Sequence, residues 1–268
     1  MTPWTPAQMT TALWLDADDA STITLNGSTV SQWNDKSGNN RHVIQPTAAW
    51  QPTYAPSGLN GRPSLAFDGG PPSPTTSDYL SFPSGFLNAV PAFSLVMVMQ
   101  GPEQTNNAVF GPQETGERGL ELVYTALVDW PTLVRINNVN RVTSGLWSTN
   151  NTPSLSFLTS TASATAGWLN GSTVFSTAGN APLNFNGTYA LGRYYAGYHA
   201  AMNVSEFIIT TNDLSTAARQ KLEGYLAWKW GLVASLPVDH PYKSTAPTIT
   251  SIGSKMYYYR QMKNRSIL

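Results

Sequence analysis

Cysteine is absent from the 268-residue chain, and charged residues make up only 11% of it. Without cysteine, disulfide bonds, thiol catalysis and cysteine-ligated zinc are excluded. The 15 basic and 15 acidic residues cancel, which argues against nucleic acid as the main partner, because such binding depends on neutralising phosphates. The charge is unevenly spread, however: ten basic against fifteen acidic residues give residues 1–242 a charge of −5, and residues 243–268 carry +5 with no acid at all.

Two further features are missing. Residues 1–6 lack the charged and apolar regions of a secretory signal peptide. The longest strongly apolar stretch, residues 93–99, is far shorter than the ~20 residues needed to span a bilayer. We therefore expect no membrane insertion and a soluble protein made in a cytoplasm.

The residues that are present favour an all-β fold. Short apolar or alternating segments recur between Gly, Pro, Asn and Asp, a pattern typical of the strands of a β-sandwich or barrel. Asn-Gly, a pair suited to tight hairpin turns, begins at positions 26, 60, 170 and 186. The hexapeptide Leu-Asn-Gly-Ser-Thr-Val occurs at 25–30 and at 169–174. Because the flanking residues differ, two similar hairpin tips explain it better than a duplication does.

One segment departs from the β pattern. Ser215 and Gly231 have the residue types that begin and end a helix, which predicts a helix over about 216–230. Its Ala218, Leu222, Leu226 and Trp230 form an apolar stripe, with Arg219, Lys221 and Glu223 largely off it, so we expect this helix to brace the sandwich. From Ser244 the chain turns Thr-, Ser- and Pro-rich and then basic and aromatic. We divide it into a domain at 1–243 and a C-terminal extension at 244–268.

Several stretches together resemble the concanavalin A-like, laminin G-type jelly-roll domains of bacterial and bacteriophage proteins. They are residues 12–19, 30–39, 58–69, 78–80, 168–171, 190–193, 204–209, 222–232 and 240–242. The resemblance implies a jelly-roll sandwich of two antiparallel sheets, to which the residue pattern adds one C-terminal amphipathic helix and an extended C-terminal tail outside the resemblance. It also implies a fold used mostly to recognise glycans or proteins, although a fold alone does not fix function.

Catalytic motifs are scarce. Glycoside hydrolysis needs two suitably spaced carboxyl groups, but the nearest run, Glu114, Glu117 and Glu121, has the wrong spacing and is rich in glycine. The three histidines share no metal-ligand spacing. Residues 16–19, with three Asp, fit a strand end that runs into an Asx turn. We expect a protein that is not an enzyme and requires no cofactor.

Sugar binding needs only aromatic faces and a few polar groups. The loop aromatics that could supply them are Trp50, Tyr54, Trp130, Tyr194, Tyr195 and Tyr198. Exposed aromatics would equally suit a subunit interface, and we expect Trp14, Trp33, Trp168 and Trp230 to cover the core. The resemblance to laminin G-type domains also makes Asp68 and Asp78, which flank a Gly/Pro-rich loop, candidate calcium ligands.

The basic tail suits attachment to an acidic body, that of a sister subunit or of another virion protein. Its candidate anchoring residues are Lys255, Tyr257, Tyr258, Tyr259, Arg260, Lys263 and Arg265. The leading hypothesis is an accessory structural protein of a phage virion, in the head decoration or the tail, made in the host cytoplasm and assembled as a homo-oligomer. The alternative is an adhesin or receptor-binding module that recognises a host surface glycan. A glycan hydrolase is the third.

Overall fold

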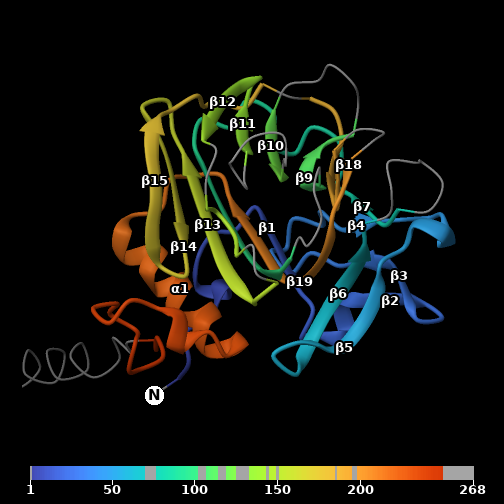
Figure 1. Cartoon of the computed structure of the whole chain (residues 1–268), viewed down its shortest axis with the longest axis horizontal. Coiled ribbons are helices and arrows are strands. Elements are labelled where there is room, and N and C mark those ends of the chain that lie inside the picture. Colours follow the sequence, from blue (N-terminus) through green and yellow to red (C-terminus); the bar gives the residue numbers. More distant parts are fainter. Residues whose placement is uncertain are drawn as a thin grey trace, which may run out of the picture.

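The structure, a computed structural model, describes residues 2–69, 77–101, 107–113, 119–124, 133–142, 145–148, 151–184, 186–194 and 198–249. These residues form an antiparallel β-sandwich with one α-helix (Figure 1). Among them, no helix is long and apolar enough to cross a membrane. The expected fold class, two antiparallel sheets with a helix near the C-terminus, is confirmed.

The first sheet is built around the long strand β19, which pairs with β8 on one side and with β1 and β6 on the other. Its strands are β1 (Leu13–Asp16), β5 (Thr53–Leu59), β6 (Arg62–Asp68), β8 (Phe93–Gln100), β13 (Ser154–Ser160), β14 (Ala164–Leu169), β15 (Ser172–Ala178) and β19 (Ala201–Thr210).

The second sheet faces the first and carries shorter strands. They are β2 (Ile23–Asn26), β3 (Thr29–Trp33), β4 (Val43–Ile44), β7 (Leu80–Ser81), β9 (Asn107–Pro112), β10 (Leu120–Tyr124), β11 (Leu133–Ile136), β12 (Val139–Val142) and β16 (Tyr189–Leu191). The two sheets meet where β3 pairs with both β4 and β5. A small hairpin of β17 (Arg193–Tyr194) and β18 (Tyr198–His199) forms a two-stranded sheet of its own that packs against β9.

Two apolar cores lie on opposite faces of the first sheet, and β8 contributes to both. Leu95 and Met97 point into the main core between the sheets, while Val96 and Val98 point to the second core under the helix. Both faces of β8 are therefore buried, which is why residues 93–99 read as one continuous apolar run instead of an alternating one.

The helix α1 (Thr216–Trp230) has the predicted bounds. The Ser215 hydroxyl accepts a hydrogen bond from the Ala218 N–H, and Gly231 ends the helix in a left-handed conformation with φ 71°. Leu222, Leu226 and Trp230 pack into the second core, as expected. In the described part of the chain, short 3-10 helices lie at Pro6–Gln8, Ala20–Thr22, Ala48–Trp50 and Val233–Ser235.

The two ends of the described chain meet beside α1. The Trp4 N–H donates to the Pro247 carbonyl at 3.0 Å, and the Ile249 N–H donates to the Thr2 carbonyl at 2.9 Å. Trp4 and Ile249 both pack on the second core, and the Trp4 ring meets Tyr225 of α1 edge-on. Residues 247–249 therefore pack with the body of the domain.

Candidate functional site

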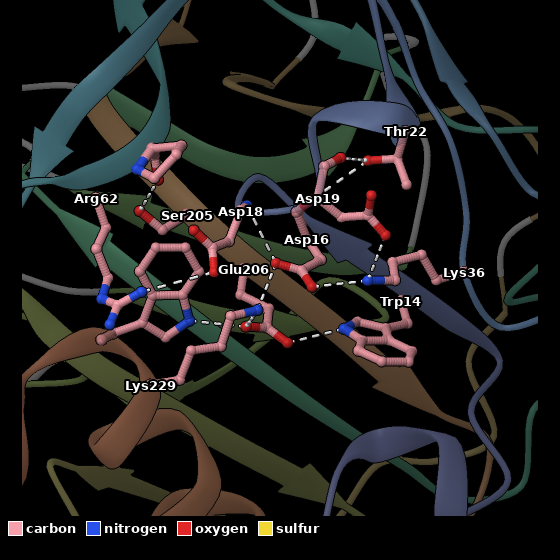
Figure 2. Close-up of polar contacts among 12 residues, drawn as sticks. Trp14, Asp16, Asp18, Asp19, Thr22, Lys36, Arg62, Ser205, Glu206 and Lys229 are labelled. Atoms are coloured by element: carbon pink, nitrogen blue, oxygen red, sulfur yellow. Dashed lines mark hydrogen bonds and ion pairs between the residues drawn. The ribbon is translucent and has the colours of Figure 1, made fainter.

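A buried ionic cluster joins α1 to the first sheet (Figure 2). Glu206 of β19 lies opposite Asp16 of β1, and the Lys229 ammonium of α1 contacts both carboxylates. The indole N–H groups of Trp14 and Trp230 also donate to Glu206, at 2.8 and 2.7 Å. Burial raises the pKa of Glu206, and the nearby Lys229 charge opposes that shift. We call Asp16, Glu206 and Lys229 with these two tryptophans the helix-anchoring cluster.

The rim of this cluster is also ion-paired. Lys36 contacts Asp16 at 2.9 Å and Asp19 at 2.8 Å, and Arg62 lies 3.6 Å from Asp18 (Figure 2). The Asp16 carboxylate accepts the Asp18 N–H at 3.2 Å, so residues 16–19 form the expected Asx turn. Because each carboxylate oxygen of Asp16 and Glu206 already has a partner, this cluster is a structural brace and leaves little for a ligand to bind.

A second buried set corrects one expectation. Arg219 and Glu223, which the sequence placed off the apolar stripe, are 8% and 0% exposed. Glu223 pairs with Arg219 and lies 3.2 Å from the His240 ring nitrogen, and the Arg219 guanidinium lies 4.3 Å over the Trp168 ring. A charged residue can be buried when its partners satisfy it, and here these contacts attach the loop around His240 to α1.

The tyrosines of the β17–β18 hairpin lie on the face of β9 and β10 that points away from the main core. Tyr194 and Tyr198 are half-buried, with ring centroids 5.9 Å apart, and pack against Ala108 and Val123. Gly111 of β9 permits this contact, since a Cβ there would lie 3.0 Å from the Tyr194 ring. Small residues on β9 thus allow two aromatic rings to lie close to the sheet.

A second aromatic group lies beside this hairpin. The Arg193 guanidinium of β17 stacks 4.6 Å over the Tyr79 ring. The centroid of the Trp50 ring lies 5.8 Å from that of the Tyr79 ring. The Tyr79 N–H also donates to the Trp50 carbonyl at 3.1 Å. Together with Tyr194 and Tyr198, these three residues form what we call the aromatic site.

Ion-paired side chains lie under the aromatic site. Glu121 of β10 is fully buried and pairs with Arg135 of β11 at 2.8 Å, and Arg135 in turn donates to Asn140 at 2.9 Å. Burial raises the pKa of Glu121, while the Arg135 charge and a hydrogen bond from the Tyr194 hydroxyl oppose the shift. The outer face of β10–β12 therefore offers a line of polar groups that touches the aromatic site at Tyr194.

The two predicted calcium ligands form a closed pair near this site. The Asp68 N–H donates to Asp78 at 3.2 Å, and the Asp78 N–H donates to Asp68 at 3.0 Å. Burial and the Asp68 charge raise the pKa of Asp78 to about 7. Within the described ranges, no group of three or more acidic or histidine side chains is arranged to hold a metal ion. A calcium ion would need further oxygen ligands beyond this pair.

Buried polar groups without partners lie next to the acidic pair. His199, which stands opposite Arg193 in the hairpin, is 5% exposed, and neither of its ring nitrogens has a hydrogen-bond partner in the described part of the chain. The same holds for the Ser77 hydroxyl. Burial and the Arg193 charge lower the pKa of His199 to about 4, so its ring is neutral at pH 7.

Of the predicted site residues, Tyr194 and Tyr198 lie together on the hairpin, Trp50 is linked to the hairpin through the buried Tyr79 and Arg193, and Asp68 and Asp78 pair with each other. A Cβ on Gly192 would lie 2.9 Å from the Asp78 carbonyl, which shows how closely the chain just before the β17–β18 hairpin approaches Asp78. Tyr54 packs against the main core instead, with Asp18 as the acid that faces it. The remaining candidates lie outside the described residues: Glu114, Glu117, Trp130, Tyr195, Lys255, Tyr257, Tyr258, Tyr259, Arg260, Lys263 and Arg265.

Sequence reasoning missed Tyr79, Arg193, Ser77 and His199. Each is next to a predicted residue in the sequence. Ser77 and Tyr79 flank Asp78, Arg193 precedes Tyr194, and His199 follows Tyr198. The expectation for four tryptophans is confirmed: Trp14, Trp33 and Trp230 are buried and Trp168 packs half-buried against the second core.

Comparisons with known proteins give a likeness in fold. Neither a protein-family model nor a curated protein matches the chain. Among solved structures, the chain is similar to Trypanosoma rangeli sialidase in complex with sialic acid, at 14% identity and a TM-score of 0.55 over 81% of this chain and 33% of that one. It is also similar to domain 4 of an extracellular arabinanase from Geobacillus stearothermophilus in complex with arabinotriose, at 15% identity and a TM-score of 0.54 over 80% of this chain and 98% of that domain.

A third similar structure is the binding domain of botulinum neurotoxin DC in complex with SialylT, at 14% identity and a TM-score of 0.52 over 81% of this chain and 51% of that one. The chain spans between a third and about half of the length of the first structures it matches. At such low identity these likenesses show the fold, a lectin-like β-sandwich, in agreement with the resemblance seen in the sequence.

Proposed function

We propose that the protein is a carbohydrate-binding domain whose glycan site is the aromatic site. The observation that carries this proposal is the position of Tyr194 and Tyr198, held half-buried on the outer face of the second sheet, beside the stack of Trp50, Tyr79 and Arg193. Aromatic faces bind the C–H groups of a sugar ring, and nearby polar groups orient its hydroxyls.

Two further points support the proposal. The polar groups that a sugar needs are close by, because Glu121 and Arg135 lie under Tyr194 and the Asp68–Asp78 pair adjoins the hairpin. In addition, two of the similar structures are complexes with sialic acid and with arabinotriose.

We also propose that the domain binds without catalysis. Among the described residues, the carboxylates near the site are engaged by their neighbours: Glu121 is ion-paired with Arg135 through one oxygen, and Asp68 and Asp78 each accept the backbone N–H of the other. A glycosidase needs an acid and a base or nucleophile aimed at one bond, and these hydrogen bonds aim the carboxylates elsewhere.

The accessory role in a phage virion stays a prediction. It depends on the extension 244–268, of which the structure describes only residues 244–249. Deleting residues 250–268 would test it, since the hypothesis fails if assembly of the particle is unaffected. The two roles are compatible, because a virion protein can carry a glycan-binding domain.

The glycan-binding proposal is tested with the full chain on a broad glycan array, followed by titration of the best ligand. We expect Tyr198→Ala and Trp50→Ala each to weaken binding by about tenfold, which is about 1.4 kcal/mol. The matched control is Trp228→Ala, because Trp228 is 41% exposed on α1, outside the aromatic site. An array without binding, or equal losses in all three variants, would refute the proposal.

A further inference from the structure

The margins of the first sheet differ in what covers them. On the side of β1 and β5, the Lys36 N–H donates to the Trp14 carbonyl at 2.8 Å, and the Tyr54 N–H donates to the Ser28 carbonyl at 2.9 Å. Pro56 of β5 also lacks the N–H that a ladder bond needs. On the other side, β15 pairs with β14 and with no further strand in the described part of the chain, and it forms the margin of the sheet in Figure 1.

This uncovered edge is long and uncharged. The strand β15 has seven residues, Ser-Thr-Val-Phe-Ser-Thr-Ala, and neither β15 nor the adjoining strands β13 and β14 contain Asp, Glu, Lys, Arg or Pro. Charge, proline, a short strand and a bulge are the usual devices that keep an exposed edge from pairing. Of these, the described chain shows at β15 a shift of register with β14 between Thr173 and Phe175. Residues 175–178 pair regularly with β14, so a straight segment of edge remains.

The same edge leaves part of the main core half covered. Val174 and Phe175 pack against that core and are only half-buried. Ser172, Thr173 and Ser176 are exposed. A further strand laid beside β15 would cover the two apolar side chains, and burial of apolar surface favours such a contact.

A second copy of this chain fits the edge without an electrostatic penalty. A strand that pairs antiparallel with itself does so about a two-fold axis, the commonest symmetry of soluble oligomers. Every register of residues 172–177 against themselves brings together only Ser, Thr, Val and Phe. Hydroxyl pairs and pairs of an aromatic with a β-branched side chain are favourable across an antiparallel ladder. A charged peptide would instead find no opposite charge on β13, β14 or β15.

From this edge we infer that the protein forms a two-fold symmetric dimer, in which the β15 strands of two copies pair antiparallel and join the two first sheets into one. The inference does not depend on the proposed carbohydrate-binding function, because β15 contributes no residue to the aromatic site. Where that site binds a glycan, the dimer carries two sites, which raises its avidity for a surface with many copies of the ligand.

Analytical ultracentrifugation of the full chain, from micromolar to near-millimolar concentration, tests for the dimer. We expect the mass to rise with concentration from the 29.0 kDa of one chain toward twice that value. A chain that remains monomeric over the whole range overturns the inference and leaves the carbohydrate-binding proposal untouched.

A charge on β15 tests whether this edge is the contact. Ser176→Lys adds a charge at an exposed position of the strand, and two copies of it in one ladder repel each other, so we expect the dimer to dissociate about tenfold more readily or worse. The matched control, Ser28→Lys, makes the same exchange at an exposed position in the turn between β2 and β3 and should dimerise like wild type. Equal losses in both variants, or a loss in neither, overturn the inference.

Cross-linking covers the case in which Ser176→Lys does not fold, as judged by circular dichroism. Because the chain has no cysteine, Ser176→Cys introduces a single thiol with little change in size. A bis-maleimide cross-linker should join two copies of Ser176→Cys into a covalent dimer and leave Ser28→Cys monomeric. The same yield from both variants, or no covalent dimer from Ser176→Cys, would contradict pairing through β15.

Discussion

Two regions along β19 treat buried polar groups in opposite ways. Around Glu206, each carboxylate oxygen of Asp16 and Glu206 has a hydrogen-bond or ion-pair partner. Near the other end of the strand, where Ala201 lies opposite Asp68, Ser77 and His199 are buried without hydrogen-bond partners in the described chain. A buried polar group without a partner typically destabilises the fold by ~1–3 kcal/mol.

This difference indicates what each region does. A buried polar cluster in which every group has a partner stabilises the fold. The helix-anchoring cluster does so by joining α1 to β1 and β19. Unpartnered buried groups also occur in the main core, at the indole N–H groups of Trp33 and Trp147, but Ser77 and His199 lie next to the proposed site, where a ligand could complete their hydrogen bonds. The aromatic site lies at the unsaturated region, so the two observations agree on where a ligand would bind.

The largest effect we predict comes from breaking the saturated cluster. Lys229→Met leaves the buried Glu206 without a cation and leaves Asp16 with Lys36 as its only cationic partner in the described chain, and removing one partner of a buried ion pair costs about 3–5 kcal/mol. Urea unfolding at pH 7 measures this free energy. Glycan binding at the aromatic site should be unchanged under conditions where the variant remains folded.

The control for this variant is on the same helix. Lys221→Met removes an ammonium that lies 5.7 Å over the Trp4 ring, a contact worth about 1 kcal/mol or less at a partly exposed site. If the two variants lose equal stability, the helix-anchoring cluster is not the main link between α1 and the first sheet.

The sequence predicted the parts of the molecule that local chemistry determines. The bounds of α1 follow from Ser215 and Gly231, and the strand over 93–99 follows from its apolar run. The helix-anchoring cluster could not be predicted in this way, because Asp16 and Glu206 meet only through the pairing of β1 with β19. Strand register between distant segments has no local signal.

The same limit applies to the candidate site. Loop aromatics such as Trp50 and Tyr198 could be selected from residue type alone, because aromatic rings in turns suit a sugar. The stack of Arg193 on Tyr79 depends instead on how β17 approaches β7, which is set by Gly192 and the close contact it allows with Asp78. Periodicity and composition carry no information about that contact.

An intermediate effect is predicted at the repeated hexapeptide, where identical sequences meet different surroundings. Asn170 accepts the N–H of buried Leu155 at 2.8 Å, whereas the exposed Asn26 donates to the Gln51 carbonyl oxygen, which keeps Thr29 as a second donor. Asn170→Gly keeps the left-handed turn possible at φ 51° but orphans the Leu155 N–H, so we expect a loss of about 1–3 kcal/mol.

Asn26→Gly supplies the control within the same hexapeptide, since it adds the same glycine freedom to the unfolded chain. We expect it to lose clearly less stability than Asn170→Gly in thermal or urea unfolding. Equal losses would mean that the turn sequence itself, and not the buried hydrogen bond, determines the energetics, and that burial of polar groups is a poor guide to the roles of the two regions.

The smallest predicted effect is the pH dependence of wild-type stability, to which Asp78 and His199 beside the aromatic site both contribute. The folded-state pKa of Asp78, about 7, lies above the ordinary value of 3.8 for this side chain, so the folded protein retains a proton that the unfolded chain releases, and this contribution to stability is lost as pH rises from about 4 to 7. The pKa of His199, about 4 against 6.5, has the opposite sign: its contribution is lost as pH falls from about 6.5 to 4.

Because the two contributions oppose each other, wild-type stability changes little with pH, and single variants reveal each one. Relative to wild type, Asp78→Asn should gain stability as pH rises across this window, and His199→Gln should lose it, each by no more than about 1 kcal/mol per pH unit, since one linked proton gives at most ~1.4. Asp213→Asn, at an exposed position, should follow the wild-type curve. Urea unfolding at several pH values checks all three. If the stabilities of Asp78→Asn and His199→Gln change in the same direction with pH, the buried groups beside the aromatic site have hydrogen-bond partners in solution. The contrast with the helix-anchoring cluster would then no longer support a ligand site at this place.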